Sequence, residues 1–119
     1  MGQPLAYFEI TSTQPEQLQN FYRELFGWKV QVFPEMGGYA VVDTDSGENS
    51  VAGGIGPVMR QAGITIYFYA PDLQAALDNA TKLGGSQVMG PTPIPGFGNF
   101  AVFTDLDGNA IGLWDRQTV

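Results

Sequence analysis

Apolar and polar residues alternate along several short stretches of the chain, and two longer stretches carry apolar residues at helical spacing. Alternation with a period of two is typical of half-buried β-strands, whereas apolar positions three and four residues apart are typical of an amphipathic helix. The clearest alternation flanks the loop at residues 105–109, whose Asp, Gly and Asn tolerate the positive φ that a tight reversal needs. We therefore predict a β-hairpin over residues 100–114.

Both helical segments begin and end at recognisable residues. The first follows Thr13, which has capping-box spacing to Glu16, and ends at Gly27. The second follows the capping residue Asp72 and ends at Gly84. We interpret the apolar stripe of each helix as core rather than as a cofactor site. The stripes consist of Leu18, Phe21, Tyr22, Leu25 and Phe26 in the first helix, and Leu73, Ala76, Leu77, Ala80 and Leu83 in the second.

The remaining pattern predicts strands at residues 5–11, 28–33, 39–43, 50–55, 64–70 and 86–90, in addition to the hairpin. The resulting order, β-α-β-β-β, occurs twice with a period near 57 residues, from Gly27 to Gly84. Residues 56–63 resemble a linker, so that a single domain, 1–119, divides into modules of about 4–57 and 63–115. Residues 91–98 are rich in Pro and Gly, which predicts a rigid loop suited to the rim or lid of a site. The fold class is α+β.

We expect the helix of each module to cover one face of the sheet, leaving the opposite, concave face for function. The covered face best fits Phe8, Ile10, Ile66, Phe68, Ile111 and Leu113. The opposite face is rich in aromatic rings with polar tips, which is typical of a small-molecule site, although a partner subunit filling the concavity is the alternative. This face carries Tyr7, Glu9, Thr65, Tyr67, Tyr69, Gly112 and Trp114.

Glu9 is the unusual member of this face. A carboxylate on an inner strand face costs several kcal/mol unless it is hydrated or partnered. We therefore expect Glu9 to face a wet cavity or to meet a hydrogen-bond donor, the alternative being an edge position in open solvent.

Composition narrows the chemistry further. The chain has no cysteine and no histidine, which removes thiolate chemistry, the commonest transition-metal ligand and the commonest general base. The formal net charge of −7, with five basic residues, disfavours nucleic acid and favours neutral or cationic ligands, unless it serves solubility alone. No apolar run approaches the ~20 residues of a membrane span, and no signal pattern opens the chain. We expect a soluble cytoplasmic protein that binds neither nucleic acid nor membrane.

Short motifs spread over nearly the whole chain carry a resemblance to a known family. They are residues 8–10 (Phe-Glu-Ile), 21–28 (Phe-Tyr-Arg-Glu-Leu-Phe-Gly-Trp), 72–77 (Asp-Leu-Gln-Ala-Ala-Leu), 83–85 (Leu-Gly-Gly), 93–96 (Pro-Ile-Pro-Gly), 100–105 (Phe-Ala-Val-Phe-Thr-Asp) and 107–109 (Asp-Gly-Asn). Together they resemble the vicinal oxygen chelate superfamily, which includes glyoxalase I, extradiol dioxygenases, fosfomycin-resistance enzymes, and bleomycin- and mitomycin-binding proteins. The chain is most similar to the bacterial glyoxalase-like branch.

The resemblance implies two βαβββ modules that curl into a cup-shaped mixed sheet with the helices outside, and a homodimer in which each cup borrows strands or walls from its neighbour. It also implies metal-ligand positions in the first and last strands of each module. These positions are Tyr7, Thr65, Gly112 and, less certainly aligned, Gly53. Glycine cannot ligate through a side chain, and Thr and neutral Tyr are poor ligands for a divalent transition ion. We therefore expect neither a metal nor another cofactor.

Three functions fit these observations. The first is a metal-free small-molecule binding protein, similar to the drug-sequestering members, which holds a planar, neutral or cationic ligand. The second is a lyase or isomerase with Glu9 as its general base, or with a hard ion on Glu9 and Asp43. The third is a structural or interaction module, or a degenerate relative whose concave face is closed by its own side chains. The predicted ligand-binding residues are Tyr7, Glu9, Trp28, Tyr39, Thr65, Tyr67, Tyr69 and Trp114.

Overall fold

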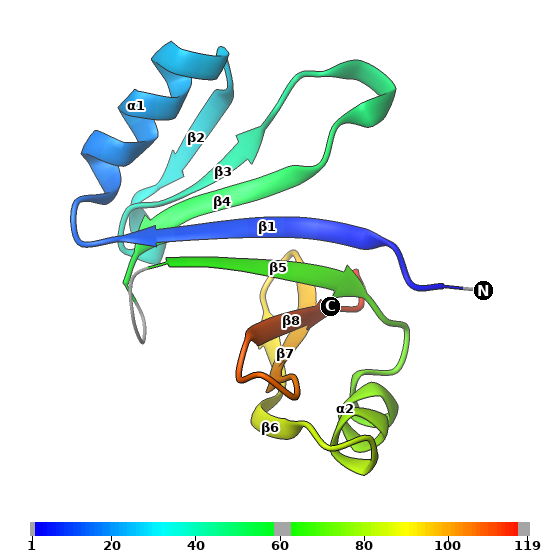
Figure 1. Ribbon diagram of the computed structural model, residues 1–119. Helices are drawn as coiled ribbons and strands as arrows, with labels where there is room; N and C mark the ends of the chain where they lie inside the picture. The colour runs from blue at the N-terminus through cyan, green and yellow to red at the C-terminus, as the bar shows by residue number, and fades with distance from the viewer. Residues whose placement is uncertain (1, 59–62, 117–119) are drawn as a thin grey trace. The chain divides into compact units, whose positions relative to one another are not determined.

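The computed structural model describes residues 2–58 and 63–116, apart from the side chain of Asn49. Within these residues the elements follow the order β-α-β-β-β twice, so the predicted α+β class and module order are confirmed (Figure 1). The first module contains β1 (Leu5–Ser12), α1 (Pro15–Phe26), β2 (Lys29–Phe33), β3 (Tyr39–Asp43) and β4 (Ala52–Pro57), with 3-10 turns at Pro34–Met36 and Gly47–Asn49. The second contains β5 (Gly63–Tyr69), α2 (Leu73–Lys82), β6 (Ser86–Ile94), β7 (Gly98–Thr104) and β8 (Ala110–Trp114).

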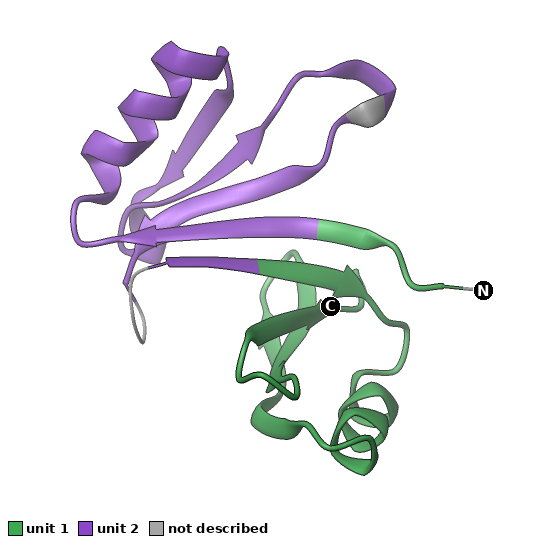
Figure 2. Ribbon diagram, viewed as in Figure 1, with its two compact units in different colours: residues 1–6, 66–119 green, residues 7–65 purple. Residues whose placement is uncertain are grey.

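The chain divides into two compact units, and each is described by itself (Figure 2). One unit consists of residues 7–65, and the other of residues 1–6 together with 66–119. Neither α1 nor α2, the α-helices of the described ranges, has the length and apolar character needed to cross a bilayer.

In the unit of residues 7–65 the strands lie in the order β2-β3-β4-β1. The β2–β3 and β3–β4 pairs are antiparallel, and β4 runs parallel to β1. α1 lies against one face of these strands (Figure 1), and the buried Gln19 fixes it there by donating hydrogen bonds to the carbonyls of Gly38 (3.0 Å) and Ile55 (2.8 Å). Ala40, Val42 and Ile55 are fully buried and form the core of this unit.

The start of α1 differs from the prediction, whereas its end agrees. The helix begins at Pro15, so the capping position falls on Gln14, whose side chain makes no capping hydrogen bond. The predicted capping box of Thr13 and Glu16 is therefore wrong, because Thr13 lies one residue before the capping position. The Ser12 hydroxyl instead accepts a hydrogen bond of 2.8 Å from the Gln14 amide. Gly27 ends the helix in the left-handed conformation (φ 70°), as predicted.

The apolar stripe of α1 is buried only in part. Phe21, Leu25 and Phe26 are 54%, 57% and 56% exposed, so interpreting them as core is wrong in the chain by itself. Tyr22 is half-buried and stacks on Trp28, with ring centroids 5.1 Å apart.

In the unit of residues 1–6 and 66–119 the strands lie in the order β5-β8-β7-β6. β5 and β8 are parallel, and the other pairs are antiparallel, which confirms the hairpin of residues 100–114. Asp72 caps α2 as predicted, accepting a hydrogen bond of 3.0 Å from the Ala75 amide. The core beneath α2 is built by Ala70, Leu73, Leu77, Ala101 and Leu113, with Phe68, Ala76 and Phe103 packed against it.

The predicted loop of residues 91–98 is wrong. β6 continues to Ile94 and pairs with β7 as far as Ile94–Gly98, which leaves a tight turn at residues 95–97. β6 is the last strand of its sheet order, and an edge strand tolerates Pro91 and Pro93 because a missing N–H costs no ladder hydrogen bond there. The predicted linker is shorter than expected, since β4 reaches Pro57 and β5 starts at Gly63; residues 59–62 lie outside the described residues.

Candidate functional site

Three side chains of the first module form a hydrogen-bonded chain. The Tyr39 hydroxyl donates to Oε2 of Glu9 at 3.0 Å and lies 2.5 Å from the Tyr7 hydroxyl. Because Tyr39 gives its proton to Glu9, Tyr7 is the donor of the second bond. Glu9 thus meets a donor, one of the two surroundings expected for it.

Gly54 makes this arrangement sterically feasible. Glu9 and Tyr39 come from β1 and β3, and β4 lies between these two strands. Gly54 of β4 is the register partner of Glu9 on one side and of Val41 on the other. A Cβ atom at Gly54 would lie 1.8 Å from the Tyr39 hydroxyl and 2.4 Å from the Tyr7 hydroxyl. The two tyrosine side chains therefore reach across β4 over a bare backbone.

Both tyrosines are neutral at physiological pH. Burial raises the pKa of Tyr7 to about 12, and the nearby negative charge of Glu9 adds to this effect. Burial raises the pKa of Tyr39 as well, as do Tyr7 and the carboxylate of Glu9 beside it. The site therefore offers one carboxylate and two hydroxyl groups that keep their protons.

The second module carries an aromatic surface of its own. Tyr67 is buried, and its ring lies over Gly112, where a Cβ atom would come within 2.2 Å of it. Tyr69 is the register partner of Trp114 in the parallel pair of β5 and β8. The Trp114 indole donates a hydrogen bond of 2.6 Å to the carbonyl of Phe97, which fixes the orientation of its ring.

Arg116 belongs to this surface and is absent from the sequence-based prediction. The carbon centre of its guanidinium lies 5.0 Å from the centroid of the Tyr69 ring and 5.7 Å from that of the Trp114 ring. The strand alternation that placed Gly112 and Trp114 on one face, continued by two positions, was the signal that could have found it. Here the aromatic surface of the second module means Tyr67, Tyr69, Trp114 and Arg116.

The register corrects one predicted position. In both modules a parallel pair joins the first strand to a glycine 45 residues later, Glu9 to Gly54 and Tyr67 to Gly112. The counterpart of Gly112 is therefore Gly54 and not Gly53. Gly53 faces the other side of the sheet, where a Cβ atom would meet the Phe8 ring at 2.2 Å. A slip of one residue in a strand exchanges the two faces.

The structure does not bring Trp28 together with Tyr7, Glu9 and Tyr39. Trp28 packs between the rings of Phe8 (5.3 Å), Tyr22 (5.1 Å) and Phe26 (5.1 Å), so its environment is the helix side of the first module. Its role as a wall for a ligand stays a prediction. Thr65 lies in β5, two residues before Tyr67, and is half-buried.

The residues at the family's metal-ligand positions do not fit a divalent transition ion. Tyr7 keeps its proton and donates it to Tyr39, and Thr65 offers a hydroxyl. At Gly54 and Gly112 the space that a ligating side chain would take is filled by tyrosine side chains. The described residues also contain no group of three or more carboxylates placed to hold a metal. This donor set therefore carries no metal-assisted step.

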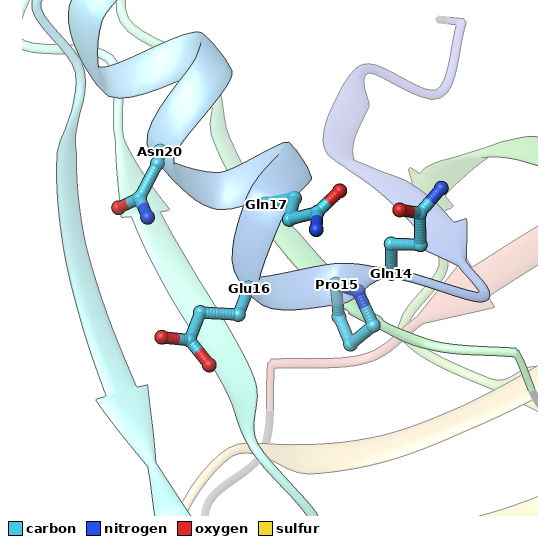
Figure 3. Close-up of a pocket in the computed structure, with 5 residues that line it drawn as sticks. All are labelled: Gln14, Pro15, Glu16, Gln17 and Asn20. Carbon is cyan, nitrogen blue, oxygen red and sulfur yellow. The ribbon is translucent and has the colours of Figure 1, made fainter.

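A pocket of about 530 Å³ lies at the beginning of α1 (Figure 3). It is lined by Gln14, Pro15, Glu16, Gln17 and Asn20, and none of them belongs to the predicted site. Its lining combines polar and apolar surface and includes one carboxylate, that of Glu16.

Comparisons with known proteins agree with this architecture. Residues 5–113 match the family described as "Glyoxalase/Bleomycin resistance protein/Dioxygenase superfamily", so the chain belongs to this family. The "Anthracycline biosynthesis protein DauV" of Streptomyces sp. (strain C5) is 30% identical over 127 residues, which cover 93% of this chain and 46% of that protein. The chain therefore spans about half the length of this relative.

Two further comparisons cover most of both chains. A "Glyoxylase-like domain-containing protein" of Didymella fabae is 29% identical, and the match covers 94% of this chain and 93% of that protein. Among solved structures, methylmalonyl-CoA epimerase from Mycobacterium tuberculosis has a TM-score of 0.67 at 14% identity, covering 95% of this chain and 87% of that chain. At this identity the structural likeness concerns the fold alone.

Proposed function

We propose that this protein binds a planar small molecule without a metal ion, as the drug-sequestering members of the family do. The ligand stacks on the aromatic surface of the second module and forms hydrogen bonds with its polar groups. Each aromatic stacking contact contributes about 0.5–1.5 kcal/mol beyond the burial of apolar area. The relationship to an anthracycline biosynthesis protein supports a flat, polycyclic ring system as the ligand.

One observation carries the proposal. Both glycines at the last-strand ligand positions lie under tyrosine side chains, Gly54 under Tyr39 and Tyr7, and Gly112 under Tyr67. The groups that hold an ion in metal-using members are thus replaced in both modules by aromatic rings and hydroxyl groups. Such groups suit a planar organic molecule with oxygen or nitrogen at its edge.

Tryptophan fluorescence tests the proposal, because the two tryptophans have different surroundings. Trp28 lies in the aromatic cluster of α1, and Trp114 lies on the aromatic surface of the second module. A planar tricyclic compound, anthracene-9-carboxamide, is expected to quench the wild-type protein and Trp28→Phe, but not Trp114→Phe. It is also expected to raise the melting temperature. Quenching that follows Trp28, or no binding, contradicts the proposal.

A second candidate function is supported by the Glu9–Tyr39–Tyr7 chain. In a lyase or isomerase Glu9, held in place by the hydrogen bond from Tyr39, would remove a proton from a carbon next to a carbonyl group. The test is exchange of acidic carbon-bound protons of a planar 1,3-diketone with deuterated solvent, followed by NMR. Exchange that the protein accelerates and that Glu9→Gln abolishes supports catalysis. Exchange unchanged in Glu9→Gln removes this mechanism.

The homodimer implied by the family stays part of the proposal, as does the expectation of no cofactor. Light scattering of the purified chain tests the dimer directly. Elemental analysis of freshly purified protein tests the cofactor expectation, and a stoichiometric divalent ion would contradict it.

A further inference from the structure

We propose that Arg116 is a specificity-determining residue, which binds an ionised acidic oxygen of the planar ligand. The inference rests on the proposed function, since it names the chemical class of the ligand held there: an aromatic ring system that carries a carboxylate or another acidic oxygen. It reverses, at this site, the preference for cations that the net charge of −7 suggests.

The geometry of the guanidinium carries the first step. Arg116 lies over two rings at once, at 5.0 Å from Tyr69 and 5.7 Å from Trp114. A guanidinium over aromatic rings is attracted to them by cation–π interaction, and its N–H donors lie in its own plane. These donors have the spacing of the two oxygens of a carboxylate. Arg116 is exposed, so a ligand reaches it without opening the fold.

The residue before Arg116 is fixed by hydrogen bonds, and so is the backbone that leads to it. The preceding residue, Asp115, is buried, and both oxygens of its carboxylate accept hydrogen bonds from Asn99, from the backbone amide at 2.8 Å and from the side-chain amide at 3.0 Å. The Asp115 amide in turn donates to the Asn99 carbonyl at 3.1 Å. Arg116 itself has φ 59°, a conformation that is uncommon for a residue with a side chain. The backbone at β8's end thus directs the guanidinium back over Tyr69 and Trp114.

Position and charge together indicate the ligand class. Tyr69 and Trp114 supply aromatic surface, and Arg116, which lies over both rings, supplies one positive charge beside it. A neutral ring system would gain from the aromatic surface alone, whereas an aromatic acid would gain from both. A charge-assisted, bidentate hydrogen bond is expected to favour the acid by about tenfold or more over a neutral analogue of the same shape.

The test compares two probes of the same shape, anthracene-9-carboxylate and anthracene-9-carboxamide, by fluorescence titration at low salt. The wild-type protein is expected to bind the carboxylate about tenfold more tightly or better. Arg116→Gln is expected to remove this difference, and Arg116→Lys to keep part of it, since lysine retains the charge without the planar fork. Lys82→Gln on α2 is the matched control, because it changes the net charge equally at a distant place in the same module.

The outcomes separate this inference from the proposed function. Equal binding of both probes by the wild-type protein, or an equal loss of preference in Lys82→Gln, overturns the role of Arg116 and leaves planar-ligand binding intact. Tighter binding of both probes by Arg116→Gln also overturns it, because Arg116 would then be a plug over the rings. If neither probe binds to any variant, the proposed function fails, and this inference fails with it.

Discussion

Tyr39 donates a hydrogen bond of 3.0 Å to the carboxylate of Glu9, which lies thirty positions earlier in the chain and two strands away in the sheet. The strand between them contributes Gly54, and its missing side chain leaves room for the Tyr39 hydroxyl. The half-buried carboxylate of Glu9, the hydroxyl groups of Tyr7 and Tyr39, and Gly54 therefore depend on one another. Each of these residues can be substituted separately.

Tyr39→Phe is expected to lower the free energy of unfolding by about 1–3 kcal/mol, because Glu9 and Tyr7 each lose a hydrogen-bond partner in a partly buried place. Urea denaturation at neutral pH measures the effect. Tyr22→Phe is the matched control, since the Tyr22 ring packs in the α1 cluster and its role there depends on the ring rather than the hydroxyl. An equal change in both variants would mean that the Tyr39 hydroxyl adds no stability.

The raised pKa values of Tyr7 and Tyr39 predict a loss of stability in alkali. In the unfolded chain tyrosine loses its proton near pH 10, whereas folded Tyr7 keeps it to about pH 12, and Tyr39 also keeps its own beyond 10. Between these values the unfolded state binds fewer protons, so stability is complete below pH 10 and falls as the pH rises. The slope is about 1.4 kcal/mol per pH unit for each tyrosine.

Urea midpoints measured at a series of pH values across this window test the prediction. Tyr7→Phe is expected to make this slope shallower by about 1.4 kcal/mol per pH unit, the contribution of one tyrosine proton. This holds whatever the substitution does to stability at neutral pH. Ultraviolet absorbance of tyrosinate gives an independent readout, because Tyr7 and Tyr39 should stay protonated in the folded protein at pH 10. Identical slopes for the wild-type protein and Tyr7→Phe would show that Tyr7 titrates normally.

The two glycines under the tyrosines are expected to tolerate no side chain. Gly54→Ala places a methyl group 1.8 Å from the Tyr39 hydroxyl, and Gly112→Ala places one 2.2 Å from the Tyr67 ring. Overpacking of this kind costs about 1–3 kcal/mol, and we expect Gly54→Ala also to displace Tyr39 from Glu9. Gly90→Ala is the control in β6, because its nearest neighbour is the flexible end of the Gln87 side chain at 3.2 Å. Thermal unfolding of the three variants compares the costs, and a Gly90→Ala loss as large as the others would argue against the close approach.

The repeat of β-α-β-β-β modules followed from the sequence because it depends on local patterns: alternation in the strands, helical stripes, and glycine after each helix. Within the first module, the shared side of Tyr7 and Glu9 followed from the same alternation. The contact of Tyr39 with Glu9 did not, because it requires the strand order, which puts β3 and β1 on either side of β4. The one-residue error at Gly53 has the same origin, since neither periodicity nor composition determines the register of a glycine-rich strand.

The solvent exposure of individual side chains was the second property that the apolar spacing did not predict. Phe21, Leu25 and Phe26 have the spacing of core residues, yet each is more than half exposed, because the sheet under α1 contacts only part of the stripe. Pro91 and Pro93 led to the second wrong prediction. They suggested a loop, but they lie in an edge strand, where proline costs little.

The two helix starts offer a last comparison within one chain. Asp72 accepts a hydrogen bond from the Ala75 amide at 3.0 Å, whereas Gln14 at the corresponding position of α1 makes no such bond with its side chain. Asp72→Ala is therefore expected to destabilise the protein by about 1 kcal/mol, and Gln14→Ala to leave stability within about 0.5 kcal/mol of the wild-type value. Urea denaturation of both variants measures the difference, and far-ultraviolet circular dichroism verifies that the helices persist. A loss in Gln14→Ala equal to that in Asp72→Ala would contradict the capping assignment, because the bond to Ala75 is what distinguishes the two positions.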